Sequence, residues 1–252
     1  FKALEDDSEK IQLGGNLAVK NLLTNHWRIS EKELLFEDIA IDYVLNAQSN
    51  YIELDSSSVV HFNKLQFNPY LKLQNQPSWV VTASLHKSGF PADDLFSSIP
   101  QGMSANLEGI KTSGSLDYHF DLNIDFDNVD SLTFRSNMEK HDFKIEKMGA
   151  TDFRMIQSPF TYHAYENGEL VRSFVVGESN PNFRSLNQIS ECLRGAVMFS
   201  EDGQFFRHKG FYENAIKASL IQNLKEKRFA RGGSTISMQL VKNVFLCRNK
   251  TM

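Results

Sequence analysis

Leu116-Asp-Tyr-His-Phe-Asp-Leu-Asn-Ile-Asp-Phe126 carries the clearest structural signal of this chain. Apolar residues stand at every second position from Leu116 to Phe126, and Asp, His or Asn stands between them. Because successive side chains of a β-strand point to opposite faces, this alternation predicts a long strand with one apolar face and one polar face. Such two-faced strands suit a groove for lipid, a curved sheet that packs on a partner, or a plain spacer.

Other segments of the first two-thirds of the chain repeat this β pattern. Residues 39–45 alternate more loosely, and residues 79–85 and 143–148 are further strand candidates. Asn167-Gly168 stands between two β-prone runs, and this dipeptide accepts the positive φ angles of a tight hairpin turn. Pro91 suits the first turn of one short helix over residues 92–98.

The pattern becomes helical after Gly177. Ser185 and Gln188 fit the capping-box pattern at the start of a helix. Two further helices are expected over residues 212–225 and from about residue 234. We therefore predict an α+β chain, in which a β-rich domain of long antiparallel strands (residues 1–180) precedes a helical segment (residues 181–252).

Charge divides along the same boundary. From Phe183 onward the chain holds 12 basic and 5 acidic residues, a net charge of +7, whereas the preceding part carries a net charge of −11. A basic surface suits nucleic acid, an anionic membrane or a phosphorylated substrate. Cys192 and Cys247 are too few for a disulfide framework, and we expect both to be small buried residues of helices.

Histidine is scattered through the β-rich region without the spacing of metal ligands, so no metal site is predicted there. These residues are His26, His61, His86, His119, His141 and His163.

The first candidate site is Glu201-Asp202-x-x-Phe205-x-x-His208-x-Gly210, which follows the end of an expected helix. A carboxylate near a helix C-terminus lies at the negative end of the helix dipole, which favours its protonated form and suits it to general acid or base catalysis. The alternative is a plain helix-ending turn, in which Gly210 supplies a positive φ angle and His208 makes a local hydrogen bond. Spacing within this motif leaves both interpretations open.

The second candidate site is a glycine-led helix start that begins at Arg231. Its polar or conformationally special residues are Gly232, Gly233, Ser234, Thr235, Gln239, Lys242 and Asn243. The two hydroxyl residues can cap the helix, and a glycine-rich turn that enters a helix N-terminus is suited to binding an anion. The amide and ammonium side chains then share one helix face. An amphipathic helix with a solvated polar face is the alternative.

Together the two motifs resemble the first two signature motifs of the peptidoglycan glycosyltransferase (transglycosylase) domain, glycosyltransferase family 51. This domain occurs in class A penicillin-binding proteins and in monofunctional transglycosylases. The family patterns are E-D-x-x-F-x-x-H-x-G and G-G-S-T-I-x-x-Q-L-x-K-N, and every specified position is present in this chain. The resemblance covers about residues 182–252 and implies an α-helical, lysozyme-like fold for that segment.

The resemblance also implies roles for individual residues. The family polymerises lipid II into glycan strands, and Glu201 would be the general base that deprotonates the acceptor 4-hydroxyl. The residues implied to contact the donor pyrophosphate and nearby sugars are Ser234, Thr235, Gln239 and Lys242. The residues implied to support the site are Asp202, Phe205, His208, Gly210, Gly232, Gly233 and Asn243. No cofactor is required, although a divalent cation (Mg²⁺ or Mn²⁺) assists some members by neutralising the pyrophosphate.

The implied location is the bacterial cell envelope, on the periplasmic side of the inner membrane. The expected partners are lipid II, the growing glycan chain and the membrane surface, with no nucleic acid. An anchor outside residues 1–252 is expected, because no membrane-spanning run is visible and the chain begins with Phe1. The β-rich part resembles AsmA-type envelope proteins, which handle or bridge lipids, so envelope proteins are further expected partners.

The sequence departs from the family pattern in one respect. A third motif, with a second essential glutamate, is expected after Met252. We therefore expect an enzymatic parent protein of which residues 1–252 alone are inactive. The alternative is a non-catalytic envelope scaffold or lipid-handling protein with a degenerate transglycosylase segment.

Overall fold

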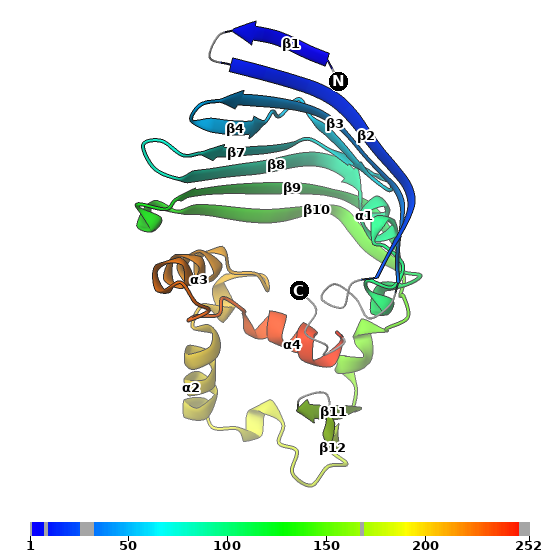
Figure 1. The fold of residues 1–252 in the computed structure, drawn as a ribbon. Helices are drawn as coiled ribbons and strands as arrows, with labels where there is room; N and C mark the ends of the chain where they lie inside the picture. Colours follow the sequence, from blue (N-terminus) through cyan, green and yellow to red (C-terminus); the bar gives the residue numbers. More distant parts are fainter. Residues whose placement is uncertain (1, 8–9, 26–32, 167–168, 247–252) are drawn as a thin grey trace.

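The computed structural model describes residues 2–7, 10–25, 33–166 and 169–246, with the backbone alone described for residues 2–7 and Ala105. A large, strongly curved antiparallel sheet forms one half of the molecule, and short helices and a small hairpin form the other half (Figure 1). The strands of the large sheet are β1 Lys2–Asp7, β2 Lys10–Thr24, β3 Leu34–Gln48, β4 Tyr51–Leu54, β5 Val59–Phe62, β6 Leu65–Phe67, β7 Pro69–Gln74, β8 Val80–Pro91, β9 Lys111–Asp125 and β10 Thr133–Lys147. The hairpin is β11 Phe160–Glu166 and β12 Glu169–Val176.

The sheet is a meander in which most neighbouring strands are close in sequence. Its order is β1-β2-β3-β4-β7-β8-β9-β10, and β5 pairs with β3 and β6. Antiparallel neighbours of this kind need only short connections. The longest strands, β2, β3, β9 and β10, each have 15 residues, so the sheet is long enough to bend along its strands, as Figure 1 shows.

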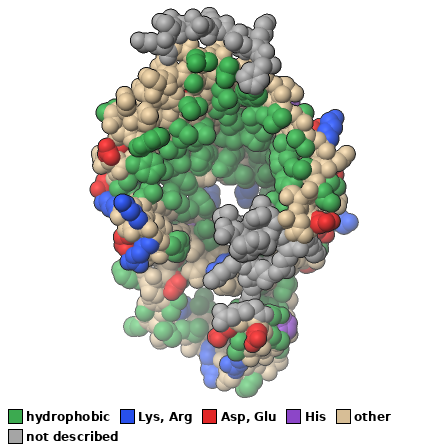
Figure 2. All heavy atoms as spheres, viewed as in Figure 1, with side chains coloured by type: hydrophobic (Ala, Val, Ile, Leu, Met, Phe, Trp, Pro, Cys, Tyr) green, Lys and Arg blue, Asp and Glu red, His purple; other side chains and the backbone are tan. Residues whose placement is uncertain are grey.

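One face of this sheet is apolar almost from edge to edge, and we call it the apolar face. Directly opposed residues of antiparallel strands project from the same face, and the strand register aligns apolar residues of β2, β3, β4, β7, β8, β9 and β10. These include Leu13, Leu17, Ile39, Ile41, Leu45, Ile52, Leu73, Val81, Leu85, Phe120, Leu122 and Phe134. Figure 2 shows hydrophobic side chains gathered on the hollowed side of the sheet-forming half.

Only one end of the apolar face is covered by a described helix. Helix α1 (Ala92–Ser98) packs there and contributes Ala92 to a core with Phe90 and Leu116. Elsewhere large apolar side chains are open to solvent: Leu17 is 62% exposed and Ile52 is 57% exposed. An uncovered apolar area of this kind marks an interaction surface.

The helical half begins after β12. Its helices are α2 Glu191–Asp202, α3 Glu213–Glu226 and α4 Ile236–Val244. Short 3₁₀ turns are η1 Ala105–Leu107, η2 Val129–Ser131, η3 Phe153–Gln157, η4 Leu186–Gln188 and η5 Phe205–Arg207. Among the residues described, no helix is long and apolar enough to cross a membrane.

Two sets of contacts join the helical half to the sheet. Helix α3 lies along the edge strand β10, where the Ser136 backbone N–H donates to Glu213 Oε1 at 2.8 Å and Lys225 Nζ lies 2.6 Å from Asp130 Oδ1. The residue after α4, Phe245, is buried against the ring of Phe153 with 5.1 Å between ring centroids. The amide of Asn106 also donates to the Phe245 carbonyl. Helix α3 therefore rests on the edge of the sheet, and the end of α4 packs on η1 and η3, the turns that precede β9 and follow β10.

The main β predictions are confirmed. The alternating stretch lies in β9, the looser alternation lies in β3, and the other two candidates lie in β8 and β10. The short helix after Pro91 is α1. The hairpin strands pair as expected, while the Asn167-Gly168 turn lies outside the described residues. The structure is α+β and β-rich, whereas the lysozyme-like fold and the boundary at residue 180 stay predictions.

Two local predictions need correction. The Ser185–Gln188 capping box is present, but it closes the single turn η4, and α2 begins later behind its own cap, Ser190. Ile189 between them is extended, which ends the first turn. Cys192 is exposed, because it lies in the first turn of α2 away from the sheet, so the expectation of a buried residue was wrong. Cys247 lies outside the described residues.

Candidate active site

The first motif starts in the last turn of α2. Glu201 is exposed there, whereas the adjacent Asp202 is buried, with 8% of its surface accessible. Residues one position apart on a helix point in different directions, so the two carboxylates meet different surroundings. This division leaves Glu201 available to a ligand and commits Asp202 to the interior.

Asp202 and His208 form a buried hydrogen-bonded pair. His208 Nε2 lies 3.0 Å from Asp202 Oδ1 and 3.1 Å from Oδ2, and the Gly210 backbone N–H donates to His208 Nδ1 at 3.1 Å. Because Nδ1 accepts a hydrogen bond, Nε2 carries the proton and donates it to the carboxylate. The pair therefore fixes one tautomer and one ring orientation of His208, and Tyr212 stacks on the ring at 5.5 Å between centroids.

Asp202 also links the first motif to the second. Its Oδ2 accepts from the backbone N–H of Ile236, the first residue of α4, at 3.1 Å. Burial raises the pKa of Asp202, but the hydrogen bonds from His208 and Ile236 together outweigh burial, so the pKa lies below its ordinary value. An ionised carboxylate beside the positive end of α4 also interacts favourably with the helix dipole.

Thr235 provides a second link between the motifs. Its hydroxyl caps α4 by accepting from the Met238 N–H at 3.2 Å, and it donates to the Gly210 carbonyl at 2.5 Å. Thr235 is 2% exposed. Gly210 meets this hydroxyl with a φ angle of +97°, a conformation that residues with a Cβ rarely adopt. In this structure the Thr235 hydroxyl is therefore used within the chain, and its contact with substrate stays a prediction.

The glycine-led loop before α4 is held against α3. The Asn223 side-chain oxygen accepts from the N–H groups of Ala230 and Arg231, both at 2.8 Å. A Cβ on Gly233 would lie 2.9 Å from the Ile216 Cα, whereas a Cβ on Gly232 would meet nothing within 4 Å. Close approach of the loop to α3 therefore requires glycine at position 233, and position 232 has no such steric requirement.

One hydrogen bond joins the second motif to Glu201 of the first motif. The Gln239 amide Nε2 donates to Glu201 Oε2 at 3.0 Å, across 38 positions of sequence. Lys242 and Asn243 lie further along α4, with Lys242 exposed, and Ser234 is exposed just before the helix. The structure thus places a carboxylate, an amide, a hydroxyl and an ammonium group on α4 and the adjoining end of α2.

The start of α4 offers fewer free backbone N–H groups than the expected anion site requires. The N–H groups of Ile236 and Met238 are already engaged by Asp202 and Thr235, so these two donors are not available to a ligand. Binding of an anion by the side chains of Gln239 and Lys242, further along the helix, stays a prediction.

Aromatic residues surround the first motif. Phe205 contacts Phe206 and His208 through edge-to-face arrangements with centroids 5.3 and 6.3 Å apart. Phe206 is 89% exposed and Phe199 is 84% exposed. Exposed aromatic side chains beside a polar site suit a ligand that is partly apolar.

Sequence reasoning missed Asn223 and Tyr212. Asn223 lies on the polar side of α3, where nothing in the spacing distinguishes it from a solvated residue. Tyr212 is the residue immediately before α3 and stacks on His208. Their roles become visible only when the loop and α4 are folded back onto α3.

Comparison with known proteins gives a family for this part of the chain. Residues 167–252 match the family model described as Transglycosylase. A biosynthetic peptidoglycan transglycosylase of Nitrosomonas eutropha is 49% identical over 65 residues, which are 26% of this chain and 27% of that protein. A biosynthetic peptidoglycan transglycosylase of Alcanivorax borkumensis is 39% identical over 75 residues, 30% of this chain and 31% of that protein. Penicillin-binding protein 1A/1B of Bacillus subtilis is 31% identical over 102 residues, 40% of this chain and 11% of that protein.

The resemblance predicted from the two motifs is therefore confirmed: residues 167–252 carry a transglycosylase-family segment. The chain spans roughly a quarter to a third of the length of the biosynthetic transglycosylases that it matches. No solved structure matches the chain.

Proposed function

We propose that this chain is part of a bacterial peptidoglycan glycosyltransferase that polymerises lipid II, with Glu201 as the general base. The observation that carries the proposal is the 3.0 Å hydrogen bond from Gln239 to Glu201, because it joins the two motifs around one exposed carboxylate. The buried Asp202–His208 pair supports this arrangement by holding the end of α2 against the start of α4.

In the proposed reaction, Glu201 accepts the proton of the acceptor sugar's 4-hydroxyl. The hydroxyl oxygen then forms a bond to C1 of the growing chain, and the C1–oxygen bond to the lipid pyrophosphate breaks. Gln239 orients the Glu201 carboxylate, and Lys242 with Ser234 would offset the charge of the departing pyrophosphate. Asp202 and His208 act through position and do not contact the reacting atoms.

A divalent cation would enter this reaction with the pyrophosphate. Among the described residues, the group that could hold a metal ion lies in the sheet rather than at Glu201. Glu201 is hydrogen-bonded to the Gln239 amide, so we propose that Mg²⁺ or Mn²⁺ would be bound mainly by phosphate oxygens. The proposed location is the bacterial cell envelope, on the periplasmic side of the inner membrane where lipid II is used.

The test is Glu201→Gln in the full-length protein, assayed with labelled lipid II. The substitution keeps the shape of the side chain and its contact with Gln239 while removing the base, so polymerisation is expected to fall at least 100-fold. Glu191→Gln at the exposed start of the same helix is the matched control and is expected to retain activity. Unaltered polymerisation by Glu201→Gln, with the fold intact, would remove Glu201 from its role.

We also propose that residues 1–252 alone do not polymerise lipid II. Their match to a biosynthetic transglycosylase covers 27% of that protein, and the chain holds two of the family's motifs. Glycan product formed by the isolated chain, and lost again in Glu201→Gln, would contradict this.

A second candidate function is binding of lipid chains by the sheet, and the uncovered apolar face favours it. Leu17, 62% exposed, is part of this face, and its neighbour Ala18, opposite Ala40, projects from the other face. Leu17→Glu should weaken binding of a fluorescent acyl lipid, whereas Ala18→Glu should leave it unchanged. Equal binding by both variants would assign the lipid to another surface. Lipid binding by an unaltered full-length protein that does not polymerise lipid II would favour the non-catalytic lipid-handling alternative.

A further inference from the structure

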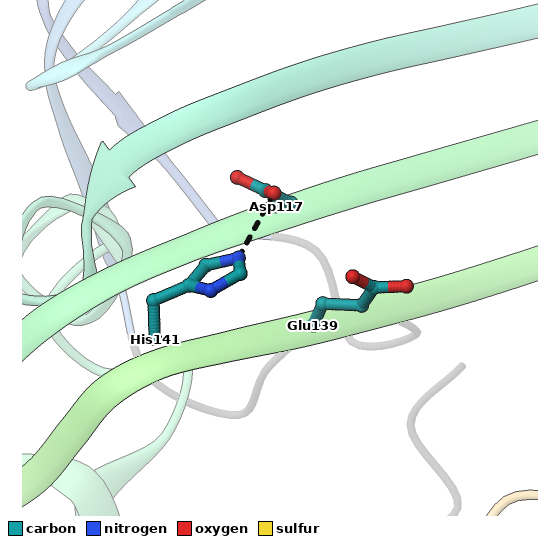
Figure 3. A group of neighbouring side chains, drawn as sticks. All are labelled: Asp117, Glu139 and His141. Atoms are coloured by element: carbon teal, nitrogen blue, oxygen red, sulfur yellow. Dashed lines mark hydrogen bonds and ion pairs between the residues drawn. The ribbon is translucent and has the colours of Figure 1, made fainter.

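Two carboxylates and an imidazole meet on the polar face of the sheet. Asp117 extends from β9, and Glu139 and His141 extend from β10 (Figure 3). One ligand atom from each side chain lies within 4.8 Å of the others. Asp117 and Glu139 are direct cross-strand partners, and His141 is two residues further along β10. Figure 3 shows the hydrogen bond between His141 and Asp117, with the Glu139 carboxylate beside them.

The opposed carboxylates are the unusual feature of this cluster. Like charges directly opposite each other in an antiparallel pair are destabilising. Four residues along β9, Asp121 makes a similar bond to His86, with 2.9 Å between Nε2 and Oδ1, but its partner on β10 is the cation Arg135. Strand β10 therefore places a cation opposite Asp121 but a second anion opposite Asp117.

A hydrogen bond from outside the cluster fixes the orientation of the Asp117 carboxylate. The Gly89 backbone N–H, in the irregular stretch where β8 shifts register, donates to Asp117 Oδ1 at 2.6 Å. Asp117 Oδ2 is then directed toward His141 Nε2, 3.0 Å away. A hydrogen bond from outside the cluster to the distal oxygen of a carboxylate is a common way to orient a metal ligand.

We propose that Asp117, Glu139 and His141 bind one divalent transition-metal ion of the Zn²⁺ type. Imidazole nitrogen suits Zn²⁺ better than Mg²⁺ or Ca²⁺, and carboxylate oxygens complete a mixed N/O ligand set. Three protein ligands with water in the fourth position satisfy the tetrahedral preference of Zn²⁺. The exposed Glu139 side chain closes the site by moving toward Asp117, and the ion replaces the hydrogen bond between His141 and Asp117.

The bound ion would fasten the edge strand β10 to β9. Helix α3 also contacts this edge: Glu213 accepts from Ser136 of β10, and Lys225 contacts Asp130 in the preceding turn η2. The site is therefore expected to stabilise the part of the sheet against which the transglycosylase-family segment packs, without touching Glu201.

The test is calorimetric titration of untagged, chelator-treated protein with Zn²⁺ alone, backed by thermal unfolding. One ion per chain is expected to bind, and saturating Zn²⁺ is expected to raise Tm, since binding to the folded state stabilises it. His141→Gln and Asp117→Asn are each expected to weaken binding at least tenfold. His86→Gln, which disrupts the analogous pair beside Arg135, is the matched control and should bind Zn²⁺ like the wild-type chain.

Several outcomes would overturn the proposal. These are the absence of saturable Zn²⁺ binding at 1:1, binding that survives both His141→Gln and Asp117→Asn, or equal loss in His86→Gln. Tighter binding of Mg²⁺ than of Zn²⁺ would refute the assigned metal class. Circular dichroism of each variant separates loss of a ligand from loss of the fold, and Glu139→Gln provides a third, exposed ligand variant for which misfolding is least expected.

Discussion

Asp202→Asn tests the buried link between the two motifs. The wild-type carboxylate accepts hydrogen bonds from His208 and from the Ile236 backbone N–H. An asparagine of the same shape is uncharged and replaces one carboxylate oxygen with an NH₂ group. At the Oδ1 position this NH₂ group faces His208 Nε2–H, and at the Oδ2 position it faces both His208 and the Ile236 N–H, so a donor faces a donor in either orientation. A change of His208 tautomer does not relieve the clash, because Nδ1 would then carry a proton toward the Gly210 N–H.

The cost follows from placing a buried donor against a donor and losing the charge-assisted bonds of the carboxylate, which is about 1–3 kcal/mol. Since each 1.4 kcal/mol corresponds to a factor of ten in an equilibrium constant, local opening of the start of α4 should become about 5- to 150-fold more frequent. Side chains of Asp202 and His208 are only 4% and 5% exposed, so water cannot easily replace the lost bond.

Hydrogen–deuterium exchange of peptides that contain the first turn of α4 measures this opening directly, because exchange from a locally opened state reports its free energy. Asp121→Asn is the matched control: it alters another Asp–His pair, whose side chains are 42% and 53% exposed. Exposed pairs contribute about 0–1 kcal/mol, so exchange in α4 should not change. Less than a twofold increase in Asp202→Asn would refute the reasoning.

Three further predictions address packing and pH. Gly233→Ala should destabilise the loop against α3 and reduce activity of the full-length protein, because the added Cβ would lie 2.9 Å from the Ile216 Cα. Gly232→Ala should be tolerated, because its added Cβ would meet nothing within 4 Å. Thermal melts of the two variants check this prediction, and equal Tm values would contradict it. The stabilising contribution of Asp202 should be complete above the ordinary carboxyl pKa of about 4 and lost as pH falls through its lowered native pKa. The free energy of local opening of α4, measured by hydrogen–deuterium exchange, should therefore become equal in the wild-type chain and in Asp202→Asn at low pH. A constant difference between the two at every pH would refute this prediction. Leu116→Ala, at a position 2% exposed, should lower the free energy of unfolding in urea by about 2–5 kcal/mol. Leu17→Ala, at a position 62% exposed, should lower it by under about 1 kcal/mol. Similar losses in the two variants would show that the apolar face is covered in solution.

Local sequence patterns predicted much of the fold. The alternation from Leu116 to Phe126 specified a two-faced strand, and the structure has it in β9. Pro91 marked the start of α1, and the polar residues before α4 included its cap, Thr235. These predictions are confirmed because side-chain alternation, proline geometry and helix capping depend on residues a few positions apart.

Capping at Ser185 shows the limit of the same approach. The capping box forms, yet the extended backbone at Ile189 stops the helix after one turn. A local signal specifies how a turn can begin, whereas packing against the rest of the chain decides whether it continues.

Local patterns in the chain therefore predict the two-faced strands, the helical end and the two motifs of a transglycosylase segment. Which side chains meet depends on the folded chain: Gln239 contacts Glu201 across 38 positions, and Asp202 contacts the first N–H of α4 across 34 positions. The register of β9 and β10 likewise placed Asp117 opposite Glu139, where a shift of one residue would have separated them onto different faces. Such contacts depend on strand register and helix packing over the whole chain, and no local spacing encodes them.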